Sequence, residues 1–405
     1  MTGQLSLFAA VRFGANFVHW MVFAHLPVLL KAGGFSDVQI GLLVALFSLS
    51  SMLLMLPVGV FSDFFSPKRT IILGAFLLGI YLVSLMTVRS FGPLTLIIVI
   101  GGLGNASMAV ATESLYLKLF GREKRGQRVA AFQLSTYLGY GLGPLAGGLV
   151  MANGQEILFK FALAGIFLVF FLSFFLVDAS PIVFSFRSYK GDLWQPKPLF
   201  LLACIFVLGS HFGVEQTSFS LFMRENLGFP PETVGLIFAG LGLWMALVVP
   251  FIGRLHDQRQ QVFFFFLVGT LISSLFQIFT VWATGFWSLL FIRLLHTTGD
   301  AIALLELAVL TAAFFPTNRL GGNSGLLYAV RTMATFLAAI LAGIINKHWG
   351  YGLSFILNGA GILVLAGVSM AFIRLSPELR QSVGWGHDQS ADRNKNTEFR
   401  SQESE

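Results

Sequence analysis

The stretch GFSDVQIG at residues 34–41, an apolar run, and then PVGVFSDFFSPKR at residues 57–69 decide the fold of this chain. A related stretch follows later, where GFPPETVG at 228–235 leads through a second apolar run to PFIGRLHDQRQ at 250–260. The corresponding positions of the two copies are Gly34 and Gly228, Gly41 and Gly235, Gly59 and Gly253, and Asp63 and Asp257. The repetition predicts that the chain is a duplicated unit.

Composition places the two copies in a membrane. Of the 405 residues, 56% are hydrophobic and only 11% are charged. The chain repeatedly offers apolar runs of about 18 residues or more, the length that a helix needs to cross about 30 Å of hydrocarbon. A barrel would instead show alternating segments of about 10 residues, and a helix satisfies its backbone hydrogen bonds within itself. The sequence therefore predicts an all-α polytopic membrane protein.

The apolar runs predict twelve transmembrane helices in two sets of six. The first set is expected near 6–30, 38–61, 69–88, 95–119, 127–151 and 156–177, and the second near 199–223, 232–253, 262–282, 286–314, 323–346 and 352–373. This pattern gives an N-terminal bundle at 1–178, a cytoplasmic linker at 179–198 and a C-terminal bundle at 199–374. Residues 375–405 are polar with mixed charge, so we expect a disordered cytoplasmic tail.

The distribution of basic residues predicts the orientation. Most of the 26 Lys and Arg residues fall in loops on the side that holds both termini, which the positive-inside rule makes cytoplasmic. This bias accounts for the net charge of +7, and the chain lacks the basic folded module that nucleic-acid binding requires. The first apolar stretch carries Arg12 and His19 without a cleavage site, so it is expected to remain as helix 1. Cys204 is the single cysteine, which rules out a disulfide framework or a Cys-based metal site.

Two six-helix halves joined by a polar linker resemble the major facilitator superfamily over residues 5–374. The superfamily's loop between helices 2 and 3 reads roughly G-x-x-x-D-x-x-G-x-[RK]-[RK], and the matching residues here are Gly59, Asp63, Lys68 and Arg69. Ser66 replaces the loop glycine, and the second copy keeps Gly253, Asp257 and Arg259. The basic run GREKRGQR at 121–128 has the position of the basic loop that follows helix 4 in this superfamily.

The loop residues suggest a cytoplasmic gate. A glycine lets two helices approach closely, and Asp63 beyond a helix end can pair with basic groups or with a helix N-terminus of the other bundle. The resemblance implies that such pairing locks one state while the two halves rock around a midplane site. The alternative is that Asp63, Lys68 and Arg69 are ordinary solvated loop charges.

Helix 5 contains the run GYGLGPLAGG, whose notable residues are Gly139, Gly143, Pro144, Gly147 and Gly148. Glycines at four-residue spacing form a smooth groove for close helix contact, and the proline adds a bend. The run resembles the motif of the superfamily's proton-coupled drug antiporters, although Ala130 stands where that motif has a further glycine. The alternative is generic packing of small residues between helices.

Ionisable residues inside apolar helices are costly and therefore mark candidate functional sites. They concentrate in four of the predicted helices, the ones that line the cavity in the family that the chain resembles. These residues are Arg12, Asn16 and His19 in helix 1, Asn105 and Glu113 in helix 4, His211, Glu215 and Gln216 in helix 7, and Arg293, His296, Asp300 and Glu306 in helix 10. The sequence thus predicts one central aqueous cavity.

The ionisable residues differ in their predicted depth in the membrane. Counted from the loops, the residues nearest the midplane are His19, His211, Glu215 and Asp300, and those in the cytoplasmic third are Arg12, Glu113, Glu306 and Arg331. The cytoplasmic four can form ion pairs, Arg12 with Glu113 and Arg331 with Glu306. A structural role is as plausible for them as a role in transport.

Proton coupling requires a group that changes protonation as access alternates. Glu215 follows His211 by four residues, so both side chains lie on one helix face and can interact. We therefore expect Glu215 to be the main proton carrier and Asp300 the second, with His211 or His19 modulating them. The alternative for each histidine is a simple hydrogen bond to a neighbouring helix.

These features predict a secondary transporter that is not an enzyme and needs no cofactor or metal. The chain lacks the Gly-Lys-Ser/Thr loop that binds ATP phosphates and the spacing of zinc hydrolases. We expect proton-coupled efflux of a small organic molecule by a chain that can function as a monomer in a prokaryotic inner membrane. The midplane acids favour cationic or neutral substrates, whereas an Arg293 that reaches the cavity would favour an organic anion. A proton-linked uptake symporter and a non-transporting sensor on the same fold are the alternatives.

Overall fold

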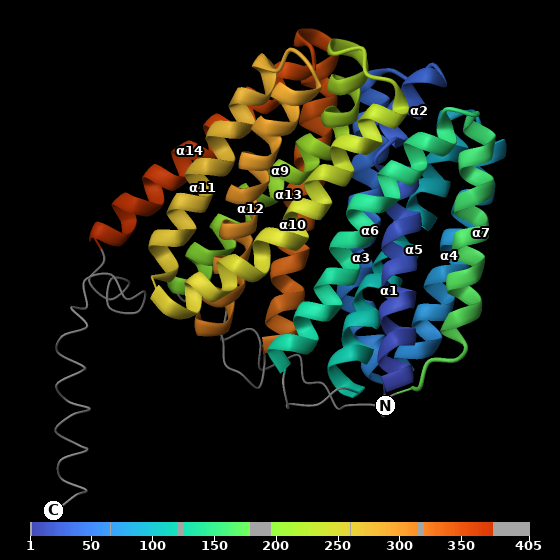
Figure 1. Cartoon of the computed structure of the whole chain (residues 1–405), viewed down its shortest axis with the longest axis horizontal. Helices are drawn as coiled ribbons and strands as arrows, with labels where there is room; N and C mark the ends of the chain where they lie inside the picture. Colours follow the sequence, from blue (N-terminus) through green and yellow to red (C-terminus); the bar gives the residue numbers. More distant parts are fainter. Residues whose placement is uncertain are drawn as a thin grey trace, which may run out of the picture.

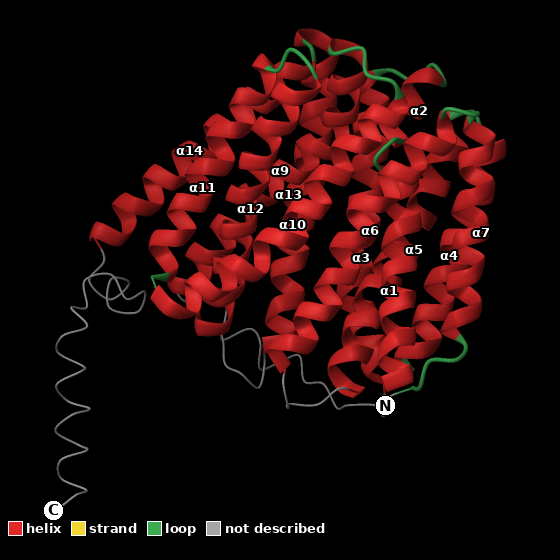
Figure 2. Cartoon of the chain, viewed as in Figure 1, coloured by secondary structure: helices red, strands yellow, loops and turns green. Residues whose placement is uncertain are grey.

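The computed structural model describes residues 2–64, 66–119, 125–178, 196–259, 261–314 and 320–375, and these residues form helices joined by short loops (Figures 1 and 2). The long helices of the first half are α1 (Thr2–Phe23), α3 (Asp37–Phe64), α4 (Pro67–Thr87), α5 (Phe91–Leu119), α6 (Arg125–Met151) and α7 (Gln155–Ser173). Those of the second half are α9 (Pro196–Leu221), α10 (Pro231–Arg259), α11 (Val262–Phe279), α12 (Phe286–Phe314), α13 (Leu320–Trp349) and α14 (Tyr351–Leu375).

These twelve long helices of the described part confirm the predicted all-α fold. Ten stretches within the described residues are long and apolar enough to cross a membrane, and Asp37–Leu53 of α3 is a shorter apolar segment. One helix differs from the prediction in its continuity, because helix 1 does not run unbroken to residue 30. The chain turns after Phe23 and restarts as the short α2 (Leu26–Ala32), where Pro27 near the helix start lacks a backbone N–H group.

The two sets of helices lie side by side and share two long contacts (Figure 1). Helix α6 packs along α10, and α3 packs along α13. Each contact is tight because glycine backbones meet without side chains: a Cβ atom on Gly41 of α3 would lie 2.8 Å from the Cα atom of Gly343 on α13. The predicted linker up to residue 195 and the predicted tail from residue 376 lie outside the described residues.

The glycine run of helix 5 lies on α6 and packs against two helices. On one side, a Cβ atom on Gly139 would lie 2.6 Å from the Cβ atom of Asn16, and Gly143 and Gly147 meet the backbone of α1 in the same way. On the other side, Gly148 lies against the first turn of α10. Pro144 stays inside the helix, and its carbonyl oxygen accepts a 2.9 Å hydrogen bond from Nε2 of His25. The predicted close helix contact is thus present and joins α1 to α10 through α6.

A polar contact closes the two halves at the ends where α3 begins and α13 ends. The Oδ1 atom of Asp37 accepts a hydrogen bond from Nζ of Lys31 at 2.8 Å and one from the hydroxyl of Tyr351 at 3.1 Å. Asp37 belongs to α3 and Tyr351 to α14, so the contact joins the first half to the second. We refer to Lys31, Asp37 and Tyr351 as the polar latch.

The predicted gate residues fall at the opposite ends of these helices. Ser66 caps α4 by accepting a hydrogen bond from the backbone N–H of Arg69 at 3.0 Å, and its hydroxyl donates to Asp178 after α7. The surroundings of Gly59, the side chains of Asp63 and Asp257, and the basic run before residue 125 lie outside what the structure describes. The gating role of these residues, and of Lys68 and Gly253, stays a prediction.

Candidate functional site

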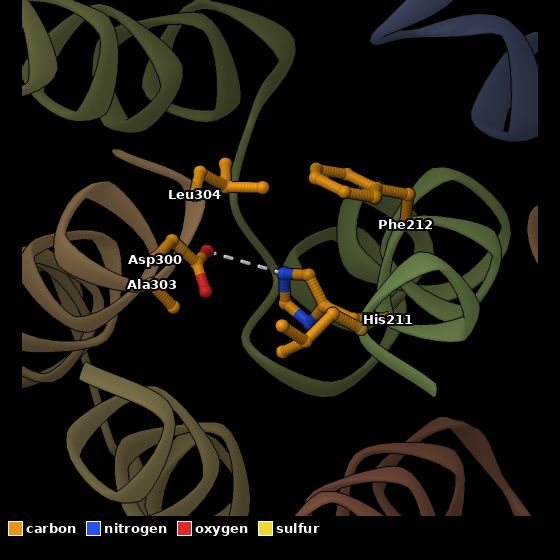
Figure 3. Close-up of a pocket in the computed structure, with 6 residues that line it drawn as sticks. His211, Phe212, Asp300, Ala303 and Leu304 are labelled. Atoms are coloured by element: carbon orange, nitrogen blue, oxygen red, sulfur yellow. Dashed lines mark ion pairs between the residues drawn. The ribbon is translucent and has the colours of Figure 1, made fainter. Parts of the chain in front are cut away.

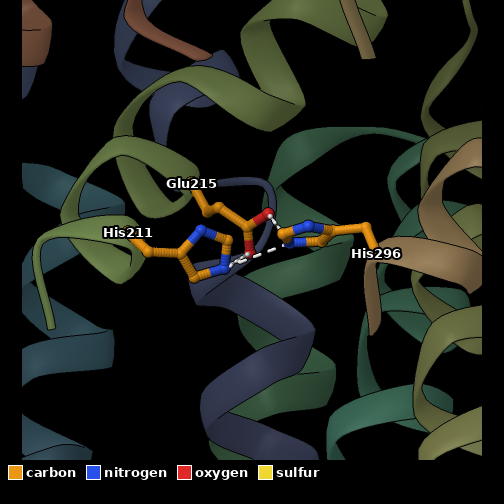
Figure 4. Close-up of side chains that lie close together, drawn as sticks. All are labelled: His211, Glu215 and His296. Atoms are coloured by element: carbon orange, nitrogen blue, oxygen red, sulfur yellow. Dashed lines mark hydrogen bonds and ion pairs between the residues drawn. The ribbon is translucent and has the colours of Figure 1, made fainter. Parts of the chain in front are cut away.

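The candidate site is built by two helices of the second half that face each other. Helix α9 carries His211 and Glu215 one turn apart, and α12 carries Arg293, His296 and Asp300. The Nε2 atom of His211 lies 3.3 Å from Oε2 of Glu215, as predicted from their spacing. Figure 4 shows the Glu215 carboxylate pointing between the two imidazole rings. We refer to these five residues as the charged cluster.

Arg293 is the buried cation of the charged cluster. Its guanidinium group donates to Glu215 through Nη2 and to Oε1 of Gln277 on α11 through Nη1, the latter at 2.8 Å. The ring of Phe219 lies 4.4 Å from its Cζ atom, and the residue is only 1% exposed. Because a buried charge is tolerated only with a partner and hydrogen bonds, Arg293 holds Glu215 in place.

Asp300 is held by both histidines. Its Oδ2 atom lies 3.2 Å from Nε2 of His211 and 3.2 Å from Nε2 of His296. Its Oδ1 atom accepts a 2.6 Å hydrogen bond from the hydroxyl of Ser273 on α11. The Nδ1 atom of His296 donates to the backbone carbonyl of the same Ser273 at 2.7 Å. Ser273 of helix α11 therefore orients both Asp300 and His296.

The hydrogen bonds around His296 require a proton within the charged cluster. Because Nδ1 of His296 donates to a carbonyl, a neutral ring carries a lone pair at Nε2. That lone pair faces the Asp300 carboxylate oxygen at 3.2 Å. The contact is favourable only when His296 is doubly protonated or when the carboxyl group itself carries the proton. The geometry therefore offers a place where one added proton improves the hydrogen bonding.

The charge of the cluster leads to the same conclusion. One guanidinium and two carboxylates leave a net charge of −1 when both histidines are neutral. Glu215 and Asp300 have side chains only 17% and 14% exposed, so this charge is largely withdrawn from water. A single proton would neutralise the cluster, and neutrality is the less costly state in a medium of low dielectric constant.

A small pocket opens beside the charged cluster (Figure 3). Its lining residues are Leu208, His211, Phe212, Asp300, Ala303 and Leu304. Figure 3 shows His211 pointing at Asp300 on one side and the Phe212 ring on another. From the first half, Tyr140 of α6 lies within electrostatic range of Arg293 and Asp300. A side chain of the first half therefore lies near the charged cluster.

The residue types of the charged cluster also raise the question of a metal. The ligand atoms of His211, Glu215 and His296 lie within 4.8 Å of one another, a donor set that suits a divalent transition metal. Arg293, however, already pairs with the Glu215 carboxylate. A fixed guanidinium at this carboxylate opposes a second cation, so the residues fit an internal ion pair better than a metal site.

The predicted residues of helix 1 lie apart from the charged cluster. His19 stacks on Phe23 at 4.8 Å and on Phe47 at 5.5 Å between ring centroids. Asn16 donates from Nδ2 to the backbone carbonyl of Arg12 within α1. Among the described residues, neither side chain bonds to α9 or α12, so their part in the predicted cavity stays a prediction.

Arg12 forms hydrogen bonds that connect α1 with two other helices of the first half. Its guanidinium group donates to the hydroxyls of Thr112 on α5 at 2.9 Å and of Thr136 on α6 at 3.1 Å. The predicted partner Glu113 has its side chain outside the described residues. The contacts with α5 and α6 give Arg12 a packing role between three helices.

The predicted pairing of Arg331 with Glu306 is wrong. Glu306 is fully buried and pairs with Nδ1 of His256 on α10 at 3.0 Å. Arg331 on α13 lies against aromatic rings instead, with its Cζ atom 4.7 Å from the Tyr328 ring centroid. Spacing along a sequence does not fix the rotation of one helix against another, and α12 turns Glu306 toward α10.

Sequence reasoning missed the residues that orient the charged cluster. Ser273 and Gln277 lie on α11, and their polar side chains within an apolar run were the available signal. Tyr140 lies inside the glycine run of α6. The glycines of this run indicate close helix packing, and they give no sign that Tyr140 lies near the charged cluster. None of these groups is charged, so a search for intramembrane charges passes over them.

Two sets of six membrane-length helices with charged groups buried among them define a polytopic helical membrane protein with the architecture of a carrier. A family model described as "Major Facilitator Superfamily" matches residues 8–220 and 201–392. The chain belongs to this superfamily, and it is a secondary transporter rather than an enzyme.

Relatives and solved structures agree with this membership. The chain is 25% identical to "Quinolone resistance protein NorA" of Staphylococcus aureus over 335 residues, which cover 80% of this chain and 84% of the relative. It is 25% identical to "MFS-type transporter SLC18B1" of Rattus norvegicus over 401 residues, which cover 91% and 85%. The fold matches a bacterial homologue of the human lysosomal transporter Spinster with a TM-score of 0.77 at 14% identity, covering 93% of this chain and 97% of that one.

Proposed function

We propose that the chain exports a small organic molecule in exchange for protons, with Glu215 and Asp300 as the proton-carrying carboxylates. The observation that carries the proposal is the contact of Asp300 with the Nε2 atoms of both His211 and His296. A group that couples transport to a proton gradient must gain and lose a proton reversibly, and this cluster is one charge short of neutrality.

The contacts suggest how a proton changes the structure. A proton on Glu215 removes the negative charge that holds Arg293, and a proton on Asp300 changes which histidine nitrogen donates. Both changes alter the attraction between α9 and α12. Tyr140 brings α6 of the first half into the same field, so the rearrangement acts on the contact between the two halves.

Two observations favour efflux over uptake. The glycine run of α6, which resembles the motif of drug antiporters, allows α6 to pack closely against both α1 and α10. In addition, a relative over 80% of the chain has quinolone resistance in its name. A proton-linked symporter on the same fold would use the same cluster and differ in the direction of substrate movement. We propose that the protein resides in a prokaryotic inner membrane.

The test is proton movement in energised inverted membrane vesicles that contain the protein, followed with a pH-gradient dye. Cationic, neutral and anionic compounds are added in turn. An exporter dissipates the gradient in the presence of its substrate, and Glu215→Gln or Asp300→Asn abolishes that response. The matched control is Glu156→Gln on α7, whose side chain is 79% exposed and lies outside the charged cluster.

Each other outcome changes the conclusion. Undiminished coupling in Glu215→Gln and Asp300→Asn would reject these carboxylates as proton carriers. Accumulation of a substrate in whole cells that collapses with an uncoupler would make the chain a symporter. A complete lack of flux in both assays would reject transport and favour a sensor.

A further inference from the structure

Arg331 on α13 is a cation that has no acidic partner among the described residues. Within the described part of the chain its guanidinium group forms no ion pair and no hydrogen bond. Its Cζ atom lies 4.7 Å from the Tyr328 ring centroid and 5.4 Å from that of Phe212. The residue is half-buried, so its charge is only partly hydrated. A half-buried charge without a partner is costly, and a bound anion would remove that cost.

Packing places Arg331 at the meeting of the two halves. A Cβ atom on Gly209 of α9 would lie 2.9 Å from the Cα atom of Arg331, so this residue is level with the turn that precedes His211. Tyr137 of α6, in the first half, lies within electrostatic range of Arg331. The next residue of α13, Thr332, reaches Sδ of Met55 on α3 at 3.9 Å. Arg331 therefore lies near residues of the first half.

Phe212 connects Arg331 with the pocket beside the charged cluster. Its ring lines that pocket together with His211 and Asp300 (Figure 3). The centroid of the same ring lies 5.4 Å from the Cζ atom of Arg331. A flat aromatic molecule can stack on Phe212 while an acidic substituent reaches Arg331. A planar guanidinium group binds a carboxylate through two parallel hydrogen bonds, which a lysine cannot reproduce.

The buried Arg293 and the half-buried Arg331 differ in whether their donors can bind a substrate. Arg293 is 1% exposed, and both of its terminal nitrogens already donate, Nη2 to Glu215 and Nη1 to Gln277, so they cannot bind a substrate without breaking the cluster. Within the described part of the chain, the donors of Arg331 have no acceptor. The buried acids Asp300 and Glu306 are occupied, because Asp300 is bound to two histidines and Glu306 to His256. Among the described residues near the pocket, Arg331 is therefore a charged group that can take up a new ionic partner.

We propose that Arg331, with Phe212 and Tyr328, forms an anion-recognition site that selects aromatic carboxylates. As a statement about substrate choice it rests on the proposed transport function, but binding itself requires neither a proton gradient nor transport. The site would direct the carrier toward organic anions, in contrast to the cationic or neutral substrates that the midplane acids favour in the sequence.

The test is calorimetric binding to the purified full-length protein without a proton gradient. The probes are three naphthalene derivatives of nearly equal shape: 2-naphthoate, 2-naphthylmethylammonium and 2-naphthalenemethanol. We expect 2-naphthoate to bind best, and Arg331→Gln to weaken it about 10- to 100-fold, the effect of losing hydrogen bonds between charged groups. The same variant should leave the alcohol unaffected. Arg331→Lys should recover only part of the loss, and Arg254→Gln, at an exposed arginine of α10, should have no effect.

The outcomes separate this inference from the proposed function. If the folded wild-type protein does not prefer 2-naphthoate, or if Arg331→Gln binds it equally well, the anion site is rejected, and the cluster can still couple protons to another substrate. If Arg331-dependent binding is found but vesicles show no flux, the site stands and proton-coupled transport fails. A thermal unfolding profile of Arg331→Gln that matches wild type shows that lost binding is not lost folding.

Discussion

His211 of α9 and His296 of α12 face each other through their Nε2 atoms at a distance of 3.2 Å. Two such nitrogens attract only when one of them carries a proton and the other does not, and Asp300 competes for the same proton. The number of protons in the cluster therefore decides which of its groups are bound to each other. A rearrangement of this kind couples protonation to the spacing of two helices.

His211→Gln tests whether this arrangement couples protons to transport. The variant removes one of the two histidines that contact both Glu215 and Asp300. We expect gradient-driven transport in proteoliposomes to fall about tenfold or more, the effect of losing a hydrogen bond to a charged group. Substrate exchange at equal pH on both sides should persist, because it needs no net proton movement. An equal fall in both assays would show that His211 acts only in folding.

Arg293→Gln should destabilise the second half. The substitution removes the guanidinium partner of Glu215 in a largely buried site, which costs about 3 kcal/mol or more. Thermal unfolding can be followed with a thiol-reactive dye, because Cys204 is the only cysteine and is 1% exposed in the folded chain. The double variant Arg293→Gln/Glu215→Gln should regain much of the lost stability. Equal unfolding temperatures for the single and double variants would contradict the pairing.

Gly147→Ala should weaken the packing of α6 against α1. The added methyl group would overlap the carbonyl oxygen of Met21, and overpacking of this kind costs about 1–3 kcal/mol. The matched control is Gly79→Ala on α4, where a Cβ atom meets nothing within 4 Å. We expect Gly79→Ala to unfold at the wild-type temperature or slightly above, because alanine is the better helix former. Similar losses in both variants would contradict a specific contact.

Tyr351→Phe should loosen the polar latch between α3 and α14. The variant removes one of the two hydrogen bonds that Asp37 accepts, and about 1 kcal/mol should raise the open population of this face several-fold. The measurement is maleimide labelling of a cysteine introduced at Ala342, which is 1% exposed, in a Cys204→Ser background. A cysteine at the exposed His348 should react at an unchanged rate. Unchanged labelling at both positions would show that the latch does not control this face.

The sequence was sufficient for the fold because hydrophobic length is a one-dimensional property. Long apolar runs predicted the long helices, and α12 begins and ends where the prediction placed it, at 286 and 314. The break between α1 and α2 was missed because the whole stretch is apolar and the turn depends on a tertiary contact. His25, at that turn, forms a hydrogen bond to the backbone carbonyl of Pro144 on α6. No pattern in the neighbouring sequence predicts this partner.

The candidate site was predicted only in part. Glu215 and His211 could be paired because a spacing of four residues fixes their relation on one helix. Asp300 was identified as an intramembrane acid, but its two histidine partners depend on how α9 and α12 are rotated. The same dependence on rotation explains the wrong partner for Arg331. Contacts within a helix follow from spacing, whereas contacts between helices require packing.

The charged cluster draws all five of its members from α9 and α12, and its orienting groups Ser273 and Gln277 come from α11. All three helices belong to the second copy of the repeated unit. No member of this cluster comes from the first half. If the cluster couples protons to transport as proposed, substitutions in the first half could change what the carrier accepts while the proposed coupling residues stay intact, which would give such a protein an evolutionary route to new substrates.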